Sequence, residues 1–527
     1  MKQLWYGGTI YTMDKENETV EAVLVENDKI TAVGSIEVLM DQADETINLQ
    51  GTAMYPGFVD SHLHMIFQGE KLIRLDLSKA SSADEMLEML KEAAKATPPD
   101  KWLLGEGWND NNFGDCRIPT KQELDEIRKE PILLTRVCHH VVLGNSAALE
   151  AGGVTENSPS PAGGEIGRSS EGRINGLLYD NAMMAVTNAI PRVGEAYIQE
   201  LVNELNLCID DMLSKGLTGG HTEDMHYFGH YTNPLKAFLR TVGEKHHFRV
   251  NLLRHHAVFG EMMENHVHFD EPFIEPGAMK IFTDGALGGS TAALSKPYTD
   301  NPNNQGILIQ TDQELEELIK LARSYNEAVA AHIIGDAGAE QIIGLLEKYP
   351  VPSGKRDRLI HACVLREDLV ERMTKLPVVV DIQPLFVPSD FPWVEKRLGQ
   401  DRLEYAYAWK TLLDKGIMCA SGTDAPVEEI NPIASIYAAV ERKKPGDAHN
   451  GYIPEQKISR FEAIRSYTVG SAQAISKEHE RGLIKPGYTA DFSIFDRDLF
   501  KGTSEEMLEA KAVKTVVAGR IVFERKQ

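Results

Sequence analysis

The feature that most constrains the fold is a series of eight short apolar runs separated by longer stretches. Each run is nearly continuous in hydrophobic residues, as expected for strands of a parallel sheet that is covered by helices. Two of the intervening stretches, 195–214 and 312–325, have helical character. Eight β–α units of this kind predict an α/β fold, a closed (β/α)8 TIM barrel. The runs are 53–62, 216–224, 248–256, 277–285, 328–336, 357–364, 377–384 and 416–424.

Strand-like segments also occur at both ends of the chain. Residues 4–34 predict strands with a hairpin turn at Glu-Asn-Asp-Lys, and 490–496 and 513–523 predict further strands. Neither end is large enough for a core of its own. We therefore predict a small composite β-sandwich domain built from residues 1–54 plus 482–527, around a barrel at 55–481.

The gap between the first and second barrel runs is unusually long. It contains strand-like segments, KWLLGEGW and PILLTRVCHHVVLG, followed by a Gly/Ser/Pro-rich stretch at 152–176. The sequence therefore predicts an inserted α+β subdomain at 66–190, directly after barrel strand 1.

Composition excludes several classes of protein. The chain of 527 residues has 79 acidic and 55 basic side chains, a formal charge of −24, which argues against a nucleic-acid partner. No apolar run reaches the ~18–20 residues of a membrane helix, so no membrane partner is expected. The first 14 residues lack an apolar secretory core. Five dispersed cysteines form no disulfide framework, and a cytoplasmic location is expected.

Metal-ligand residue types recur where the predicted strands end. In such barrels the catalytic groups stand at the C-terminal ends of the strands. His62 and His64 lie on one face of the first run, because strand residues two apart share a face. Neutral imidazoles and carboxylates are standard zinc ligands, and a buried lysine can react with CO2 to form a carbamate ligand. The set is His62, His64, Lys280, His332, His361 and Asp424.

Each of these residues alone has an ordinary alternative explanation. An H-x-H pair arises readily by chance, and a second one, His266–His268, lies in an acidic stretch and is predicted to be exposed. His361 could be a core histidine, Lys280 half of an ion pair, and Asp424 a helix N-cap. The joint pattern, at the same end of five of eight predicted strands, favours a metal site.

Motifs along almost the whole chain resemble the amidohydrolase superfamily, in the branch of N-substituted formamide deformylase and YtcJ-like proteins. The resemblance implies metal-dependent hydrolases on a distorted barrel with a split β domain. The motifs are YPGFVDSHLHM (55–65), GEGWND (105–110), HVVLGNSAAL (140–149), KIFTDGALGGSTA (280–292), HIIGDAGAE (332–340), GTDAPV (422–427) and PGYTADFSIFD (486–496).

The resemblance assigns roles residue by residue. His62 and His64 correspond to ligands of the buried metal, His332 and His361 to ligands of a second metal, and Lys280 to a carboxylated bridging lysine. Asp424 corresponds to the aspartate that binds metal and handles the proton. Two departures could reshape the pocket: His139 stands where relatives commonly have Gly, and GGHTED (219–224) where they more often read SVHD.

The implied reaction is hydrolysis of an amide-like C–N bond, in an N-substituted formamide, N-acyl or cyclic amide, by metal-activated water. One or two divalent metals, with zinc preferred, are the implied cofactors. A homodimer is a family-level expectation. Hydrolysis of an ester or lactone is the alternative, and a catalytically inactive binding or regulatory homologue is less favoured because all six ligand positions are filled. A nicotinamide enzyme would need a G-x-G-x-x-G after a strand, which is missing.

Residues that could contact a small-molecule amide substrate lie in the insertion and in the barrel loops. Three of them also have a structural reading: Trp108 as core, Arg254 as the partner of a neighbouring Asp, and Asp284 as the support of the loop 285–290. The resemblance implies a place near the substrate for His140 and Asn145. The candidates are Trp108, His140, Asn145, Arg254, His255 and Asp284.

Overall fold

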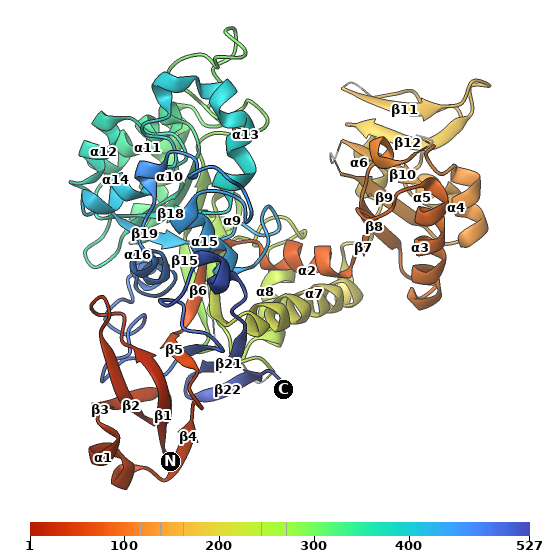
Figure 1. The fold of residues 1–527 in the computed structure, drawn as a ribbon. Coiled ribbons are helices and arrows are strands. Elements are labelled where there is room, and N and C mark those ends of the chain that lie inside the picture. The colour runs from red at the N-terminus through yellow and green to blue at the C-terminus, as the bar shows by residue number, and fades with distance from the viewer. Residues whose placement is uncertain (115–116, 138–139, 162, 244, 270, 527) are drawn as a thin grey trace. The chain divides into compact units, whose positions relative to one another are not determined.

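The computed structural model describes residues 1–527 except 115–116, 138–139, 162, 244, 270 and 527 (Figure 1). The chain divides into two compact units, one formed by Met1–Gly69 with Leu201–Gln527 and the other by Glu70–Glu200. Among the described residues no helix has the length and apolarity that crossing a membrane requires.

An eight-stranded parallel sheet forms the centre of the first unit, as the eight apolar runs predict. The order along the sheet is β6-β13-β14-β15-β16-β17-β18-β19, so that neighbours in sequence are neighbours in space. The strands are β6 (Phe58–Leu63), β13 (Leu217–Thr222), β14 (Arg249–His255), β15 (Ile274–Phe282), β16 (Val329–Ile333), β17 (Asp357–His361), β18 (Val378–Ile382) and β19 (Met418–Ser421).

Hydrogen bonds at the C-terminal rim join the last strand to the first. The backbone N–H of Asp424 donates to the His62 carbonyl at 2.7 Å, and the Thr423 hydroxyl donates to the buried Asp60 carboxylate at 2.7 Å. These bonds nearly close the sheet into a barrel. The predicted (β/α)8 fold is confirmed.

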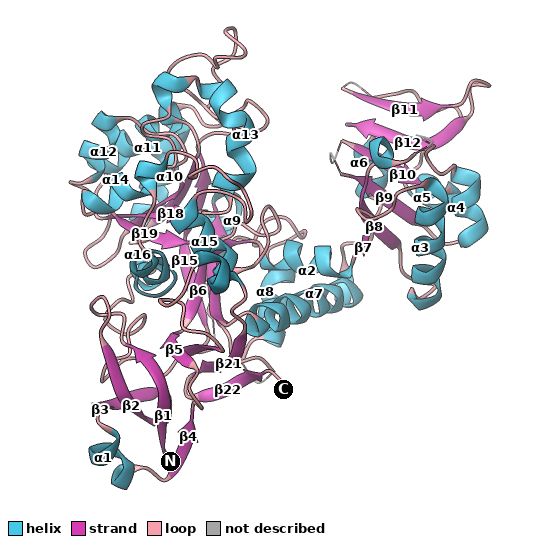
Figure 2. Ribbon diagram, in the orientation of Figure 1, coloured by secondary structure: helices cyan, strands magenta, loops and turns pink. Residues whose placement is uncertain are grey.

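Helices cover this sheet (Figure 2). In α10 the buried residues Leu315, Ile319 and Ala322 follow helical spacing, and Thr311 begins the helix with a capping box. The first unit contains α1 (Ile36–Leu39), α2 (Met65–Ile73, whose last turn crosses into the second unit), α7 (Gly194–Ser214, whose first two turns belong to the second unit), α8 (Thr232–Thr241), α9 (His256–Glu264), α10 (Asp312–Ser324), α11 (Asp336–Lys348), α12 (Glu367–Met373), α13 (Phe386–Leu398), α14 (Trp409–Asp414), α15 (Pro432–Glu441), α16 (Arg460–Arg465), α17 (Ser471–Ala474) and α18 (Ser504–Leu508).

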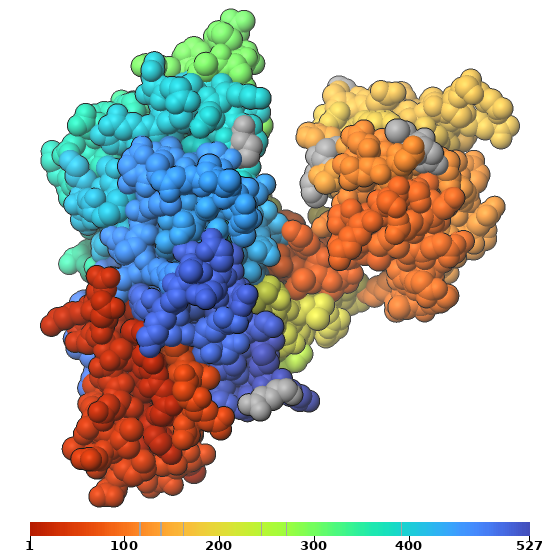
Figure 3. Space-filling view, viewed as in Figure 1, coloured from red at the N-terminus to blue at the C-terminus, as the bar shows by residue number. Residues whose placement is uncertain are grey.

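Strands from both ends of the chain pair in a second sheet of the same unit. Its order is β22-β21-β20-β5-β1-β2-β3, with β4 paired to β1, and the red N-terminal and dark blue C-terminal segments lie together in Figure 3. Separate apolar clusters pack around Trp5 and around Leu4, which alternate along β1. The strands are β1 (Lys2–Tyr11), β2 (Thr19–Glu26), β3 (Lys29–Gly34), β4 (Glu45–Asn48), β5 (Ala53–Pro56), β20 (Phe492–Phe495), β21 (Ala512–Val517) and β22 (Arg520–Glu524).

The first predicted run, 53–62, supplies strands to both sheets. Its first half is β5 of the terminal sheet, its second half is β6 of the barrel, and Gly57 lies between them. A Cβ on Gly57 would lie 2.4 Å from the Thr218 hydroxyl oxygen, so only glycine lets the chain pass β13 this closely. The Arg249–Asp491 ion pair, at 2.6 Å, links barrel strand β14 to the segment before β20.

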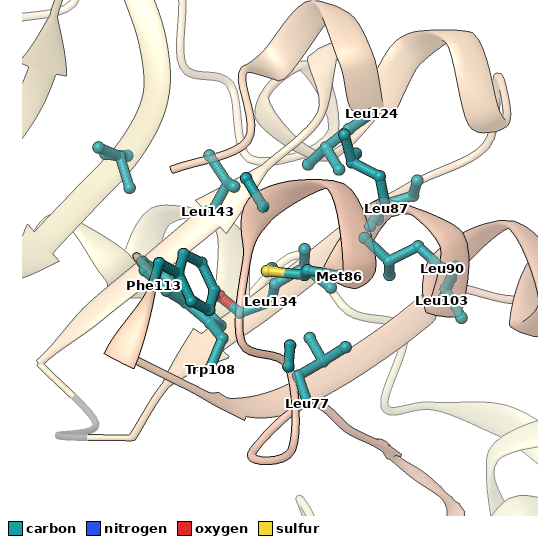
Figure 4. Packing of buried hydrophobic residues seen from close by; sticks show 14 residues of the cluster. Leu77, Met86, Leu87, Leu90, Leu103, Trp108, Phe113, Leu124, Leu134 and Leu143 are labelled. Carbon is teal, nitrogen blue, oxygen red and sulfur yellow. Dashed lines mark hydrogen bonds between the residues drawn. The ribbon is translucent and has the colours of Figure 1, made fainter. Parts of the chain in front are cut away.

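The second unit has a sheet of its own, in the order β11-β12-β10-β9-β8-β7. Trp108, Leu134 and Met86 belong to the apolar cluster between this sheet and the helix α3 (Figure 4). The elements are β7 (Leu75–Asp76), α3 (Ala83–Ala96), β8 (Leu103–Trp108), α4 (Lys121–Ile127), β9 (Ile132–Arg136), β10 (Val141–Gly144), α5 (Ser146–Ala151), β11 (Gly164–Arg168), β12 (Ile174–Asp180) and α6 (Met183–Thr187).

Strand β11 lies within the Gly/Ser/Pro-rich stretch 152–176, and its partner β12 begins at the end of that stretch, where no strand was predicted. Gly163, Gly172 and Gly176 have positive φ there, so the glycines form the turns and an irregular strand position of a real hairpin.

Candidate metal centre

Three of the predicted ligands converge at the rim where β6 and β19 meet. His62 and His64 come from β6 and the turn after it, and Asp424 follows β19. The Nε2 atoms of His62 and His64 lie 3.4 and 3.5 Å from the same Asp424 carboxylate oxygen. Among the described residues, these three form the group whose ligand atoms all lie within 4.8 Å of one another.

The other three predicted ligands lie beside them. Lys280 on β15 is 1% exposed, and its Nζ is 3.3 Å from His62 Nε2. The His361 ring centroid lies 5.5 Å from that of His62 and 4.7 Å from that of His332. All six side chains therefore meet at one end of the barrel.

Each of three imidazoles has one ring nitrogen held by an oxygen. His64 Nδ1 lies 2.6 Å from the Glu223 carbonyl, His361 Nδ1 lies 2.8 Å from Gln383 Oε1, and His332 Nε2 lies 3.0 Å from the Gly285 carbonyl. Metal-binding histidines characteristically donate their second ring N–H in this way, which orients the ring. In each ring the opposite nitrogen points away from this oxygen, and that of His64, Nε2, lies 3.5 Å from the Asp424 carboxylate.

The protonation states also suit a cation. Burial lowers the pKa of His62 and His332, and it lowers the pKa of His361 to about 4, so these rings are neutral. Burial favours neutral Asp424, but its hydrogen bond with His64 and nearby positive charges outweigh burial and lower its pKa. Neutral imidazoles with a carboxylate are the donor set that divalent zinc-like ions bind.

His64 and Lys280 show that the pocket attracts positive charge. Burial lowers the pKa of His64, but the hydrogen bond and charge of Asp424 outweigh it and raise that pKa to about 9. Burial lowers the pKa of Lys280 to about 8, against the opposing charges of Glu223 and Asp424. The Lys280 amine therefore loses its proton more readily than an exposed lysine does, which carbamate formation requires.

Buried polar contacts hold the backbone around these ligands. Arg358 (1% exposed) forms a two-pronged ion pair with Asp381 and donates to the carbonyl of Ser61, next to His62. Asp424 and His361 have φ of 57° and 76°, a region that side chains other than glycine rarely occupy. Strained residues of this kind are characteristic of functional sites.

The comparisons with known proteins agree with this geometry. The amidohydrolase family model matches residues 45–523. YtcJ of Bacillus subtilis (strain 168) is 44% identical over the full length of both chains. N-substituted formamide deformylase of Arthrobacter pascens is 26% identical, covering 98% of this chain and 97% of its own. The crystal structure of an uncharacterized metal-dependent hydrolase from Pyrococcus furiosus superposes with a TM-score of 0.80 at 27% identity, covering 95% and 100% of the two chains.

The chain belongs to the amidohydrolase family.

Three predicted substrate residues of this amidohydrolase lie in the first unit. Asp284 accepts backbone N–H groups from Ala293, Ile334 and Gly335 at 2.7–3.0 Å, so it supports the loops around His332. Arg254 is buried against the Gly277 carbonyl and pairs with Glu327 at 3.1 Å.

His255 caps α9 through Ala257 N, and its ring stacks on His226 at 4.3 Å. The Asp284 contacts match the structural reading given above, and the acid that pairs with Arg254 is a glutamate rather than the expected Asp. Substrate contact by His255, as by Asp284 and Arg254, stays a prediction.

The other three lie in the second unit of the amidohydrolase. Trp108 is fully buried and donates to the Leu134 carbonyl at 3.2 Å. Asn145 is fully buried and caps α5 through Ala148 N at 3.0 Å. His140 is exposed and lies 2.9 Å from Asp180. Their proximity to a substrate stays a prediction, and His139 lies outside the described residues.

Sequence reasoning missed residues that support or adjoin the ligands. Gln383, directly after β18, orients His361, and Glu223, directly after β13, orients His64 through its carbonyl. Both are polar residues at the C-terminal end of a predicted strand, which is the signal that identified the six ligands. Glutamine is not a usual metal ligand, which hid Gln383, and the GGHTED stretch that contains Glu223 was noted only as a departure from relatives.

Proposed function

We propose that this amidohydrolase hydrolyses an amide-like C–N bond, in an N-substituted formamide, N-acyl or cyclic amide. The observation that carries the proposal is the convergence of four imidazoles, Lys280 and Asp424 at one rim of the barrel. The relative named N-substituted formamide deformylase, similar along almost its whole length, supports a C–N bond as the target.

The proposed ligands are the six residues of the rim. His62 and His64 would hold one ion, and His332 and His361 would hold a second. A carboxylated Lys280 would bind both ions. Asp424 would complete the first site. Zinc is the preferred ion because the donors are imidazole nitrogens and carboxylate oxygens. A bound divalent ion supplies Lewis acidity toward water and toward a substrate carbonyl.

Asp424 is the proposed proton carrier. Its pKa is lowered by the His64 hydrogen bond and by neighbouring positive charges despite burial, so the group is an ionised carboxylate with no proton of its own. It would take the proton from the attacking water and deliver it to the departing nitrogen. The carbonyls of Glu223 and Gly285 and the amide of Gln383 keep the imidazoles oriented during this exchange.

The substrate is proposed to be a small-molecule amide, and the candidate contacts are Trp108, His140, Asn145, Arg254, His255 and Asp284. The enzyme is proposed to act in the cytoplasm as a homodimer without nucleic-acid or membrane partners. Neither the acyl group nor the amine is specified by the residues at the rim.

The same ligands would serve an ester or lactone hydrolase, because the acyl carbonyl is activated in the same way. The two reactions differ in their leaving groups. A departing amine must be protonated, whereas a departing alcohol needs the proton less. A panel of paired amides and esters with the same acyl group therefore separates the two activities.

The test begins with elemental analysis of the purified protein, followed by reconstitution with zinc, manganese or iron. Release of amine and acid is then followed across formamides, N-acyl amino acids, cyclic amides and matched esters. We expect one or two ions per chain, amide turnover, and loss of turnover with a chelator. Turnover of esters alone would favour the alternative, and a metal-free protein without turnover would refute the proposal.

A further inference from the structure

Glu223 is a buried carboxylate that the proposed mechanism does not use. The side chain is 0% exposed, and within the described part of the chain its carboxylate has the Tyr227 hydroxyl as its one hydrogen-bond partner. A buried carboxylate with so few hydrogen bonds is costly, so native proteins place such groups beside other charges or metal ions. The neighbouring Asp224 differs, because it accepts the Thr222 hydroxyl and the Met65 N–H at the start of α2.

The register of the barrel places Glu223 beside the metal centre. Thr222 pairs with Leu63 across β13 and β6, and the Glu223 N–H donates to the Leu63 carbonyl at 3.1 Å, so Glu223 lies level with His64. A Cβ on Gly220 would lie 3.1 Å from Met212 Cε of the covering helix α7. Gly220 and Thr222 therefore face the helix, and strand alternation turns Glu223 to the inside, as His64 is.

Charge effects agree with this placement. Glu223 is the leading charged group that opposes burial at Lys280, ahead of Asp424, and it also acts on His64. The phenol of Tyr227 adjoins the carboxylate: burial first, and then the charge of Glu223, raise the Tyr227 pKa. The carboxylate thus lies among the groups that surround the ion, and carboxylation of Lys280 would remove the one ammonium close to it.

We propose that Glu223 is a further metal ligand of this centre, contributed by strand β13. The inference rests on the proposed function, since it needs a divalent ion at the rim. The centre would then have two carboxylate side chains as ligands, Asp424 and Glu223. With a carbamate on Lys280, the site would then offer three anionic ligands to two divalent ions, which leaves one positive charge to be balanced by a hydroxide or a substrate oxyanion.

The test compares the full-length wild-type protein with Glu223→Gln, stripped of metal and then titrated with Zn2+ or Co2+. Readouts are ions bound per chain, Kd, the visible absorption of bound Co2+, and the Tm with and without metal. We expect Glu223→Gln to lose one ion or to bind at least about tenfold more weakly. The Co2+ absorption should change, and the metal-dependent rise in Tm should shrink.

The Tm of the metal-free protein separates this role from a structural one. Glu223→Gln removes a buried charge but keeps an acceptor oxygen for the Tyr227 hydroxyl, so the metal-free variant should be close to wild type in stability. A lower Tm without metal, together with wild-type affinity for Zn2+, would show that Glu223 is a structural partner of Lys280 and would overturn the inference. Glu223→Asp keeps the charge but shortens its reach, and it should weaken metal binding even if the Gln variant folds poorly.

Asp224→Asn is the matched control, because it neutralises the adjacent buried carboxylate. It should lower the Tm through loss of the α2 contacts and leave the number of bound ions unchanged. If wild type binds no divalent ion, the proposed function fails and this inference fails with it. If wild type binds ions and Glu223→Gln binds them equally, the inference alone fails.

Discussion

Asp424 shows how one residue can connect the fold and the chemistry. Its backbone N–H bonds to the His62 carbonyl, which helps close the barrel, while its carboxylate lies between His62 and His64. Its φ of 57° turns the chain sharply at this point. A substitution that keeps the size of the side chain therefore separates the chemical role from the structural one.

We predict that Asp424→Asn keeps the fold and most of the metal but loses turnover by about 10²–10⁴-fold, the range attributed to a positioned acid–base group. Circular dichroism and elemental analysis check the fold and the metal, and steady-state kinetics checks the loss. Turnover close to that of wild type would refute the proton-carrying role.

Arg358 and Asp381 form a fully buried ion pair inside the barrel, 1% and 0% exposed, close to the metal ligands. Arg358→Met should destabilise the protein by about 3–5 kcal/mol, because Asp381 is left charged and unpaired in the core. Urea unfolding measures the change. The double variant Arg358→Met/Asp381→Leu should recover part of the loss, and equal losses in both proteins would contradict this explanation.

The convergence of the six candidate ligands could be predicted from sequence because each is a histidine, lysine or aspartate at or near the end of an apolar run. Glu223 and Gln383 stand at equivalent places but could not be assigned. The role of Glu223 depends on the register shift between β6 and β13, which turns it inward beside His64. Registers of this kind result from packing between distant segments, and no local pattern encodes them.

At the scale of elements, the close approach of the chain to β13 between β5 and β6 restricts which residue can stand at position 57. Gly57→Ala should destabilise the protein by about 1–3 kcal/mol, because the new Cβ would meet the Thr218 side chain at 2.4 Å. Thermal unfolding monitors the effect. Gly34→Ala is the control: no atom lies within 4 Å of its added Cβ, so a loss equal to that of Gly57→Ala would rule out crowding as the cause.

Elements with a clear hydrophobic pattern were predictable from sequence, and elements whose geometry depends on glycines were not. The eight apolar runs and the helices α7 and α10 appear close to the expected positions. The single run 53–62 gave no sign that Gly57 divides it between two sheets. The β11–β12 hairpin was missed because its glycines resemble those of a loop, and only their positive φ values show that they make turns.

At the scale of the molecule, Arg249 and Asp491 connect the barrel to the terminal sheet. Burial alone would raise the pKa of Asp491, but the charge and hydrogen bonds of Arg249 outweigh it and lower that pKa. A carboxyl group whose pKa is lowered by folding stabilises the protein above its unfolded pKa of about 3.9. This stabilisation is lost as the pH falls through the folded value.

We therefore predict that Asp491→Asn lowers the free energy of unfolding at pH 7 and that the difference from wild type narrows as the pH falls below about 4. Urea unfolding of both proteins at pH 7, 5 and 3 measures the difference in the free energy of unfolding. The exposed Asp401→Asn serves as the control and should show a small difference. A gap between wild type and Asp491→Asn that is the same at all three pH values would contradict the linkage.

The pairing of β5 with β20 has a consequence for biosynthesis. When the ribosome has made the first sixty residues, β5 presents an open edge, and its partner is translated more than 400 residues later. Unprotected edges invite intermolecular pairing, and contacts this distant form slowly. During translation the nascent N-terminal strands are consequently the segment most in need of a chaperone.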